Sequence, residues 1–204
     1  LEDLAGRYDF FAVEGAGGLY VPLVGNTFLV LDLVRWLRLP LLVVSRAGLG
    51  TINHTALTVM AARNAGLPVA GVILNRVGPG RHEDVIRRAL GAYAGLPVLG
   101  AIPRLEGQPL PARHLGLVCA PEHPEREAVL EALAEAVARH VDLEAVWACA
   151  SRAAPLPGAV VPERPRGRGP TVRVGVLRDA AFSFYYPENL EGLEEAGAEL
   201  VPIS

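Results

Sequence analysis

Short apolar runs alternate with helix-like stretches along the first 150 residues, and this alternation limits what the chain can fold into. The apolar runs cover residues 8–13, 41–44, 69–74 and 97–102. They lack the strict apolar–polar alternation of strands with one wet face, which is typical of parallel strands covered on both sides. The sequence therefore predicts an α/β fold with a doubly wound parallel sheet.

Helical patterns separate and follow these runs. They cover residues 27–37, 52–65, 83–94, 124–140 and 143–150. Gly66 and Gly95 come directly after two of the patterns, where glycine commonly ends a helix. Asp142 precedes the last pattern and is expected to cap it.

The composition changes after residue 150. Residues 151–170 are rich in proline and arginine and have no apolar period, so we expect an interdomain linker there. A new strand is predicted over 172–177, then a helix over 187–196 and a strand from 200. We therefore expect a first domain over 1–150 and the start of a second over 171–204, cut short because one βαβ unit cannot bury both its faces.

All of the chain's 19 basic residues are arginine, and this excludes lysine chemistry. The chain as given cannot form a Schiff base or supply the lysine of a phosphate-binding P-loop. Its formal net charge of −3 shows no basic footprint for nucleic acid. Cys119 and Cys149 fit no zinc spacing, and no apolar run is long enough to span a membrane. We expect a cytoplasmic protein with neither nucleic acid nor membrane as partner.

Glu14 follows the run at 8–13, and Gly17 and Gly18 come soon after it. If the run is a parallel strand, Glu14 lies at the carboxyl end of the sheet, where open α/β folds bind ligands. A carboxylate there can hold Mg²⁺ on a nucleotide, and the glycines allow an anionic substrate to approach closely. A tight turn with an exposed glutamate explains the spacing equally well.

A second glycine-rich turn, residues 47–50, follows the run at 41–44. Thr51 or Asn53 is expected to cap the next helix, whose N-terminus would present free N–H groups to an anion. An ordinary capped helix, with His54 as a packing residue, is the simpler interpretation.

Asn75 and Arg76 end the run at 69–74. The Asn75 amide offers both a donor and an acceptor, the pattern needed to read an adenine edge, although a turn asparagine explains it too. Arg113 and His114 could bind a phosphate or carboxylate, but a surface loop is the favoured interpretation. The aromatic residues at 182–186 favour packing over a ligand pocket.

Taken together, these segments resemble known enzymes. Residues 9–76 resemble dethiobiotin synthetase through VEGAGG, RAGLGTINHT and GLPVAGVILN. Residues 75–204 resemble the cobyrinic acid a,c-diamide synthases through NRVG, PARHLGLV, VDLEAV and FYYPENL. Both families share a P-loop amidoligase fold, and FYYPENL is specific for the second. Of the two families, the chain therefore resembles the a,c-diamide synthases more closely.

The resemblance implies an amidoligase domain of the dethiobiotin synthetase-like type, followed by the start of a class I glutamine amidotransferase domain. The implied activity is the ATP- and glutamine-dependent amidation of the a and c acetate carboxylates of cobyrinic or hydrogenobyrinic acid. It implies an acyl-phosphate intermediate, Mg²⁺, and small-molecule partners: a corrin carboxylate, ATP and glutamine. A homodimer is expected of a fold of this group.

The resemblance also implies roles for single residues. Glu14 would be the catalytic carboxylate that holds Mg²⁺, and Asn75 would read adenine with Arg76 beside it. The acceptor substrate would be bound by Gly17, Gly18, Tyr20, Thr51 and Asn53.

The chain departs from the family pattern in three ways. Val21 stands where the diamide synthases usually have an aspartate near the reacting carboxylate. The family's P-loop is expected before residue 1, and the amidotransferase's nucleophilic cysteine beyond Ser204. We therefore expect a fragment, inactive alone, which binds Mg-ATP weakly or not at all.

Two other functions stay open. A dethiobiotin synthetase-like carboxylase of biotin biosynthesis would use a diaminoacid and bicarbonate instead of glutamine, and is suggested by residues 9–76. A non-catalytic nucleotide-binding module is suggested by the missing P-loop lysine.

Overall fold

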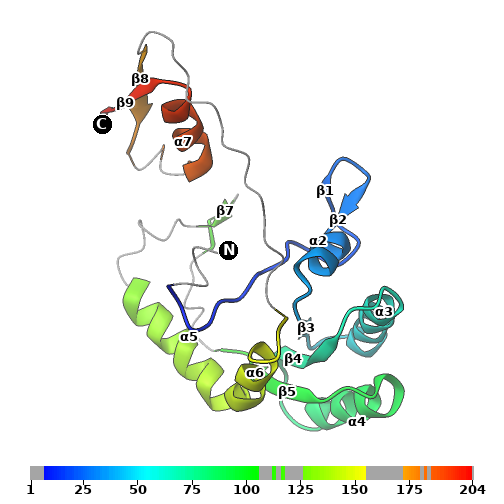
Figure 1. Cartoon of the computed structure of the whole chain (residues 1–204). Coiled ribbons are helices and arrows are strands. Elements are labelled where there is room, and N and C mark those ends of the chain that lie inside the picture. The colour runs from blue at the N-terminus through cyan, green and yellow to red at the C-terminus, as the bar shows by residue number, and fades with distance from the viewer. Residues whose placement is uncertain are drawn as a thin grey trace. The chain divides into compact units, whose positions relative to one another are not determined.

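A computed structural model describes residues 7–105, 112–113, 116–117, 126–154, 172–179, 182 and 185–203 (Figure 1). The chain divides into two compact units. The first draws on Leu1–Pro109 and Glu131–Gly158, and the second on Leu110–Leu130 and Ala159–Ser204. One of the three boundaries along the chain, between Leu130 and Glu131, falls within helix α5 (Arg126–His140).

The first unit is built on a three-stranded parallel sheet in the order β3-β4-β5. Its strands are β3 (Leu41–Arg46), β4 (Val69–Val77) and β5 (Val98–Pro103). A hairpin of β1 (Pro22–Val24) and β2 (Phe28–Leu29) precedes helix α2 (Val30–Leu37). The other helices are α3 (Thr51–Asn64), α4 (His82–Ala94) and α6 (Leu143–Ala150). An α/β fold with a parallel sheet, and three of the four predicted strands, are confirmed.

One apolar core joins α3 and α4 to the sheet. Its largest fully buried side chains are Val59, Val72, Leu74, Ile86 and Leu90. They come from α3, from the central strand β4 and from α4, so both helices bury one face against the same strand. Apolar burial of this kind stabilises the unit by about 25 cal/mol per Å² removed from water.

The predicted C-terminal ends of α3 and α4 and the predicted N-cap of α6 are confirmed. Gly66 and Gly95 follow α3 and α4 with φ of 78° and 57°, a left-handed conformation that costs glycine little. The Asp142 carboxylate accepts a 2.9 Å hydrogen bond from the Ala145 N–H and caps α6. Helix α2 begins later than predicted because Phe28 pairs with β1 first.

The prediction of a strand over 8–13 is wrong. The described residues of this segment have no ladder partner, although their apolar side chains contact the unit: the ring of Phe10 stacks on that of Trp147 with centroids 5.7 Å apart. The segment and the start of β3 line one cavity of about 310 Å³. Tyr8, Phe10 and Val13 nevertheless remain 55%, 40% and 42% exposed, so the segment has neither the burial nor, among the described residues, the backbone pairing of the predicted strand.

The second unit contains a βαβ motif. Strands β8 (Val172–Leu177) and β9 (Ala198–Ile203) pair in parallel, and α7 (Pro187–Glu195) connects them. Each strand and the helix were predicted, and Pro187 occupies the first turn of α7. The Tyr185 hydroxyl donates a 2.8 Å hydrogen bond to the Leu177 carbonyl, so this aromatic residue ties the segment before α7 to β8.

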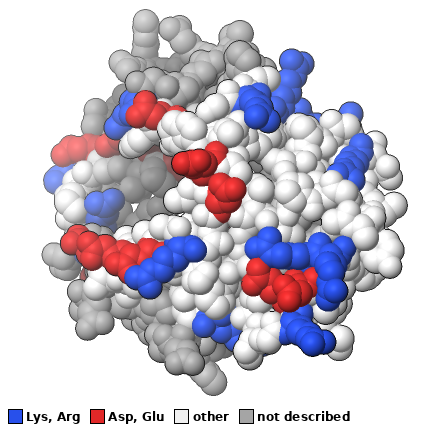
Figure 2. Space-filling view, turned by 90° about the horizontal axis from the view of Figure 1, so that it is seen from below, with Lys and Arg blue, Asp and Glu red and all other residues white. Residues whose placement is uncertain are grey.

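Two further short strands, β6 (Ala112–Arg113) and β7 (Gly116–Leu117), form an antiparallel pair. His114, Cys119 and most of the predicted linker at 151–170 lie outside the described residues. Among the helices of the described part of the chain, none combines the length and apolar character needed to cross a membrane. On the face drawn in Figure 2, several of the described arginine side chains lie next to acidic ones and others lie apart, and the described residues form no continuous basic field there.

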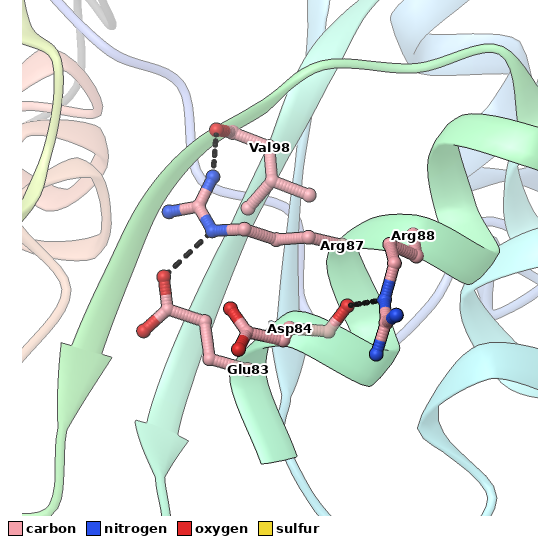
Figure 3. Close-up of polar contacts among 5 residues, drawn as sticks. All are labelled: Glu83, Asp84, Arg87, Arg88 and Val98. Carbon is pink, nitrogen blue, oxygen red and sulfur yellow. Dashed lines mark hydrogen bonds and ion pairs between the residues drawn. The ribbon is translucent and has the colours of Figure 1, made fainter. Parts of the chain in front are cut away.

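Arg87 links α4 to β5. Its Nε donates to Glu83 Oε1 one turn earlier at 2.6 Å, and its Nη1 donates to the Val98 carbonyl at 2.7 Å (Figure 3). Among the described residues, the one hydrogen bond of the Arg88 side chain is the one that Nε donates to the Asp84 carbonyl of the same helix, at 3.2 Å. Of the two neighbours, only Arg87 joins two elements.

We expect Arg87→Met to lower the free energy of unfolding of the first unit by about 1–2 kcal/mol, because the Val98 carbonyl and Glu83 lose their shared donor. Arg88→Met should cost about 0.5 kcal/mol or less. Urea unfolding followed by tryptophan fluorescence measures both, since Trp36 and Trp147 lie in the first unit. Equal losses in the two variants would contradict the bridging role.

Candidate functional site

The carboxyl edge of the sheet brings two predicted segments together. Arg46, the last residue of β3, is the register partner of Asn75 on β4. The ladder continues one step further, because the Ala47 N–H donates to the Asn75 carbonyl at 2.8 Å. The turn after β3 therefore begins beside Asn75, and both belong to one edge, where α/β sheets bind ligands.

Thr51 locks the turn after β3. Its side chain is buried, with an exposed fraction of 4%. The hydroxyl accepts a 2.8 Å hydrogen bond from the Gly48 N–H and donates to the Arg46 carbonyl. Both functions of this hydroxyl serve the backbone, so a role of Thr51 toward an acceptor substrate would be indirect.

The predicted cap of α3 by Thr51 or Asn53 is wrong. Gly50 is the N-cap, with φ of 88°, and no side chain caps the helix. Thr51 is the first helical residue and its hydroxyl turns back to the preceding loop, which removes it from capping. Asn53 is exposed in the first turn, so its amide is open to a ligand.

Gly50 is a glycine for two reasons. Its positive φ strains any other residue, and a Cβ there would lie 3.2 Å from the imidazole of His54. His54 therefore packs over the turn, as the simpler sequence interpretation predicted. A turn later, the hydroxyls of Ser45 and Thr55 share a 2.6 Å hydrogen bond that joins β3 to α3.

Arg76 sits at an irregularity of β4. The register with β5 shifts between Asn75 and Val77, and Arg76 has φ of 59°. A left-handed conformation is uncommon for a residue with a Cβ, and bulges of this kind re-aim a side chain. Asn75 itself is half-buried and Arg76 is exposed. The two neighbours therefore differ in exposure, and Arg76 is the more open to solvent of the two.

Glu14 does not follow a strand, because the strand over 8–13 does not form. It is exposed and begins a loop that continues to the hairpin. The loop is held by Leu19, whose exposed fraction is 8% and whose carbonyl accepts from the Leu31 N–H of α2 at 2.8 Å. Tyr20 is exposed beside it, with 64% of its surface open.

The structure thus joins two of the three predicted segments. Contacts connect the Thr51 turn to Asn75, whereas the Glu14 loop is tied to α2. Within the described ranges, no hydrogen bond runs from the loop of residues 14–20 to the carboxyl edge. Sequence reasoning missed Arg46, which only the register with Asn75 reveals.

The residues present are compatible with Mg²⁺ held through a nucleotide. Glu14 has no hydrogen-bond or ion-pair partner among the described residues, so its carboxylate is free to bind a cation. Mg²⁺ usually takes one or two carboxylates and fills its other positions with phosphate and water. The described part of the chain has no group of three His, Cys, Asp or Glu side chains placed to hold a metal by themselves.

The two loop glycines differ in a way that can be tested. Gly17 has φ of 79°, and a Cβ there would lie 2.8 Å from Val21 Cγ2, whereas Gly18 has no heavy atom within 4 Å of such a Cβ. We expect Gly17→Ala to destabilise the first unit by about 2 kcal/mol and Gly18→Ala by about 0.5 kcal/mol or less. Urea unfolding measures both, and equal effects would contradict the geometry.

Comparison with known proteins now adds to this geometry. A family model described as an AAA domain matches residues 2–108, more than half of the chain. The chain belongs to the AAA domain family. Its matched part contains β3, β4, β5 and the loops that carry Glu14, Thr51 and Asn75.

Several curated relatives of this AAA-domain chain are cobyrinate or hydrogenobyrinate a,c-diamide synthases. It is 51% identical over 137 residues to the hydrogenobyrinate a,c-diamide synthase of Rhodobacter capsulatus, covering 67% of this chain and 30% of that protein. The chain is 37% identical over 198 residues to the cobyrinate a,c-diamide synthase of Archaeoglobus fulgidus, an alignment that covers 95% of this chain and 42% of that protein. The cobyrinate a,c-diamide synthase of Syntrophotalea carbinolica is 38% identical over 202 residues, which are 96% of this chain and 43% of that protein.

These matches confirm the resemblance to the a,c-diamide synthases. The chain spans less than half the length of the relatives it matches. The two longer alignments include both units, so the likeness is not confined to the AAA domain.

Proposed function

We propose that the chain is part of an ATP- and glutamine-dependent a,c-diamide synthase that acts on cobyrinic or hydrogenobyrinic acid in cobalamin biosynthesis. The observation that carries the proposal is the alignment of 95–96% of the chain with proteins of that name. The names of these relatives support the proposed reaction, and the AAA domain is the reason to expect ATP. The first unit belongs to the ligase part, and the βαβ motif of the second begins a glutaminase part.

The proposed chemistry has two steps. A carboxylate oxygen of the corrin attacks the γ-phosphorus of ATP, the bond from that phosphorus to the β–γ bridging oxygen breaks, and ADP leaves. Ammonia released from glutamine then attacks the acyl carbon, and the carbon–oxygen bond to phosphate breaks to give the amide. Such transfers depend on positioning and on stabilising charge more than on covalent help from the protein.

Glu14 and Asn75 have the leading roles in this proposal. Bound Mg²⁺ would neutralise charge on the transferred phosphoryl group, and Glu14 is the residue that would hold it. Asn75, half-buried at the end of β4, would orient the adenine through its amide donor and acceptor. Arg46 and Arg76, whose guanidinium groups have no hydrogen-bond or ion-pair partner among the described residues, add two positive charges to the same edge, suited to an anionic substrate.

The acceptor would lie between the glycine loop and the turn after β3. Gly17, Gly18 and Tyr20 would border it, and the exposed amide of Asn53 would bind its carboxylate. Thr51 would act by holding the turn in place, since its hydroxyl is already engaged. A homodimer, and cytoplasmic residence, belong to the same proposal.

The experiment uses the complete protein with ATP, Mg²⁺, glutamine and cobyrinic acid. Mass spectrometry should show two carboxyl groups converted to amides, with one ADP formed for each. The competing carboxylase would instead consume a diaminoacid and bicarbonate without glutamine. Amidation absent from a folded, ATP-binding protein would contradict the diamide synthase, and turnover of the diaminoacid would favour the alternative.

A further inference from the structure

A groove of about 540 Å³ lies at the amino edge of the sheet, away from the site described above. It is lined by Val69 and Ala70, the first residues of β4, and by Pro40 just before β3. Asn75 lies six residues further along β4, about 20 Å away at the rise of a strand. A ligand in the groove therefore does not occupy the proposed nucleotide site.

Two arginines line the groove. Arg38 ends α2 in a left-handed conformation, with φ of 54°, and Arg152 follows α6. Both are exposed, and neither guanidinium has a hydrogen bond or an ion pair within the described part of the chain. Arg63 and Arg87, which link elements of the fold, differ from these two arginines because each donates a hydrogen bond to a backbone carbonyl. Two unpaired positive charges at one concavity make an anion the complementary ligand.

The rest of the groove is apolar. Its wall is formed by alanines, prolines and single larger residues such as Leu99, with the thiol of Cys149 partly buried among them. Small-molecule sites are concave, mostly apolar, about 300–1,000 Å³ in volume, and carry a few polar groups that fix orientation. The groove matches this description in size and in the ratio of apolar wall to charged groups.

We propose that the groove binds a small organic anion, with a carboxylate or sulfonate on a compact apolar body. The acid group lies between Arg38 and Arg152, and the apolar body lies against the alanine-rich wall beside Leu99. The site is independent of the proposed diamide synthase activity, because none of the described residues that line it belongs to the carboxyl edge or to the Glu14 loop.

The test uses the chain of residues 1–204 and two fluorescent probes of similar shape. One is the anion 8-anilinonaphthalene-1-sulfonate, and the other is the uncharged N-phenyl-1-naphthylamine. We expect saturable binding of the anion, weakened about threefold to tenfold by Arg38→Gln or Arg152→Gln and further by the double variant. The uncharged probe should bind equally to all of them. 1-Naphthoate should displace the anion, whereas sulfate at the same concentration should not.

Two controls separate this site from other apolar surfaces. Arg35→Gln removes an exposed charge from α2, one turn from Arg38, at a residue that does not line the groove, and should leave binding unchanged. Arg38→Lys keeps the charge and should retain most of the affinity. Among the described residues that line the apolar cavity near Phe10 there is no arginine, so binding of the anion there should not respond to the Arg38 and Arg152 variants. Unchanged affinity in the double variant, or no binding of the anion at all, overturns the proposal.

Discussion

Replacing Glu14 by Gln in the complete protein is expected to lower the rate of amidation about 100-fold or more. Loss of a residue that merely supports a metal ligand costs about 10–100-fold, and Glu14 is proposed as a ligand itself. Gln keeps the shape of the side chain but removes its charge. Because Glu14 is exposed and has no partner among the described residues, the stability of the fold should not change.

The dependence on Mg²⁺ distinguishes a metal ligand from a residue that only shapes the loop. Glu14→Gln should raise the Mg²⁺ concentration that gives half of the maximal rate, and urea unfolding should match that of the wild type. Glu131→Gln removes another exposed carboxylate, on α5, and should leave rate and Mg²⁺ dependence unchanged. A Glu14→Gln enzyme with wild-type Mg²⁺ dependence would remove Glu14 from the metal site.

Local patterns were enough to predict most of the elements. Gly66, Gly95 and Pro187 mark helix ends through backbone preferences that act within a few residues, and Asp142 caps α6 with a bond to Ala145. The apolar runs at 41–44, 69–74 and 97–102 became paired strands because each gained a neighbour. These features depend on short stretches of chain, which is the information that a single sequence contains.

The missing strand at 8–13 and the overlooked Arg46 have one cause: a local sequence pattern does not indicate which distant residue a segment will pair with. Residues 8–13 have the composition of a buried strand, yet Phe10 packs on Trp147 and the backbone finds no ladder. No sequence pattern singled out Arg46, which the register of β3 with β4 pairs with Asn75. Such pairings depend on residues about 30 or more positions away, and no local period encodes them.

The glycine-rich turn shows the same limit at the level of one hydroxyl. The glycine-rich turn before Thr51 indicated that this residue or Asn53 caps the helix, and that the free N–H groups of the helix N-terminus could bind an anion. In the structure the Thr51 hydroxyl instead accepts a hydrogen bond from the Gly48 N–H and donates one to the Arg46 carbonyl. The role of Thr51 in the proposed enzyme therefore becomes one of positioning, which has its own experimental signature.

Thr51→Val keeps the volume of the side chain but removes both of its hydrogen bonds. The Gly48 N–H and the Arg46 carbonyl then lose their partner beside a buried side chain, and each unsatisfied group costs about 1–3 kcal/mol. We expect the first unit to lose about 2–4 kcal/mol of unfolding free energy in urea, followed by tryptophan fluorescence. Thr58→Val is the matched control, because Thr58 lies on the same helix and donates only to the His54 carbonyl at an exposed position. It should cost about 0.5 kcal/mol or less.

The kinetic part of this experiment separates positioning from direct binding. If Thr51 holds the turn that carries Asn53, its loss in the complete protein should raise the KM for the corrin while the KM for glutamine stays unchanged. Thr51→Ser retains the hydroxyl and should restore most of both the stability and the corrin KM. A direct hydrogen bond to substrate would instead leave stability intact and change KM alone. Equal destabilisation by Thr51→Val and Thr58→Val would show that the hydroxyl does not lock the turn.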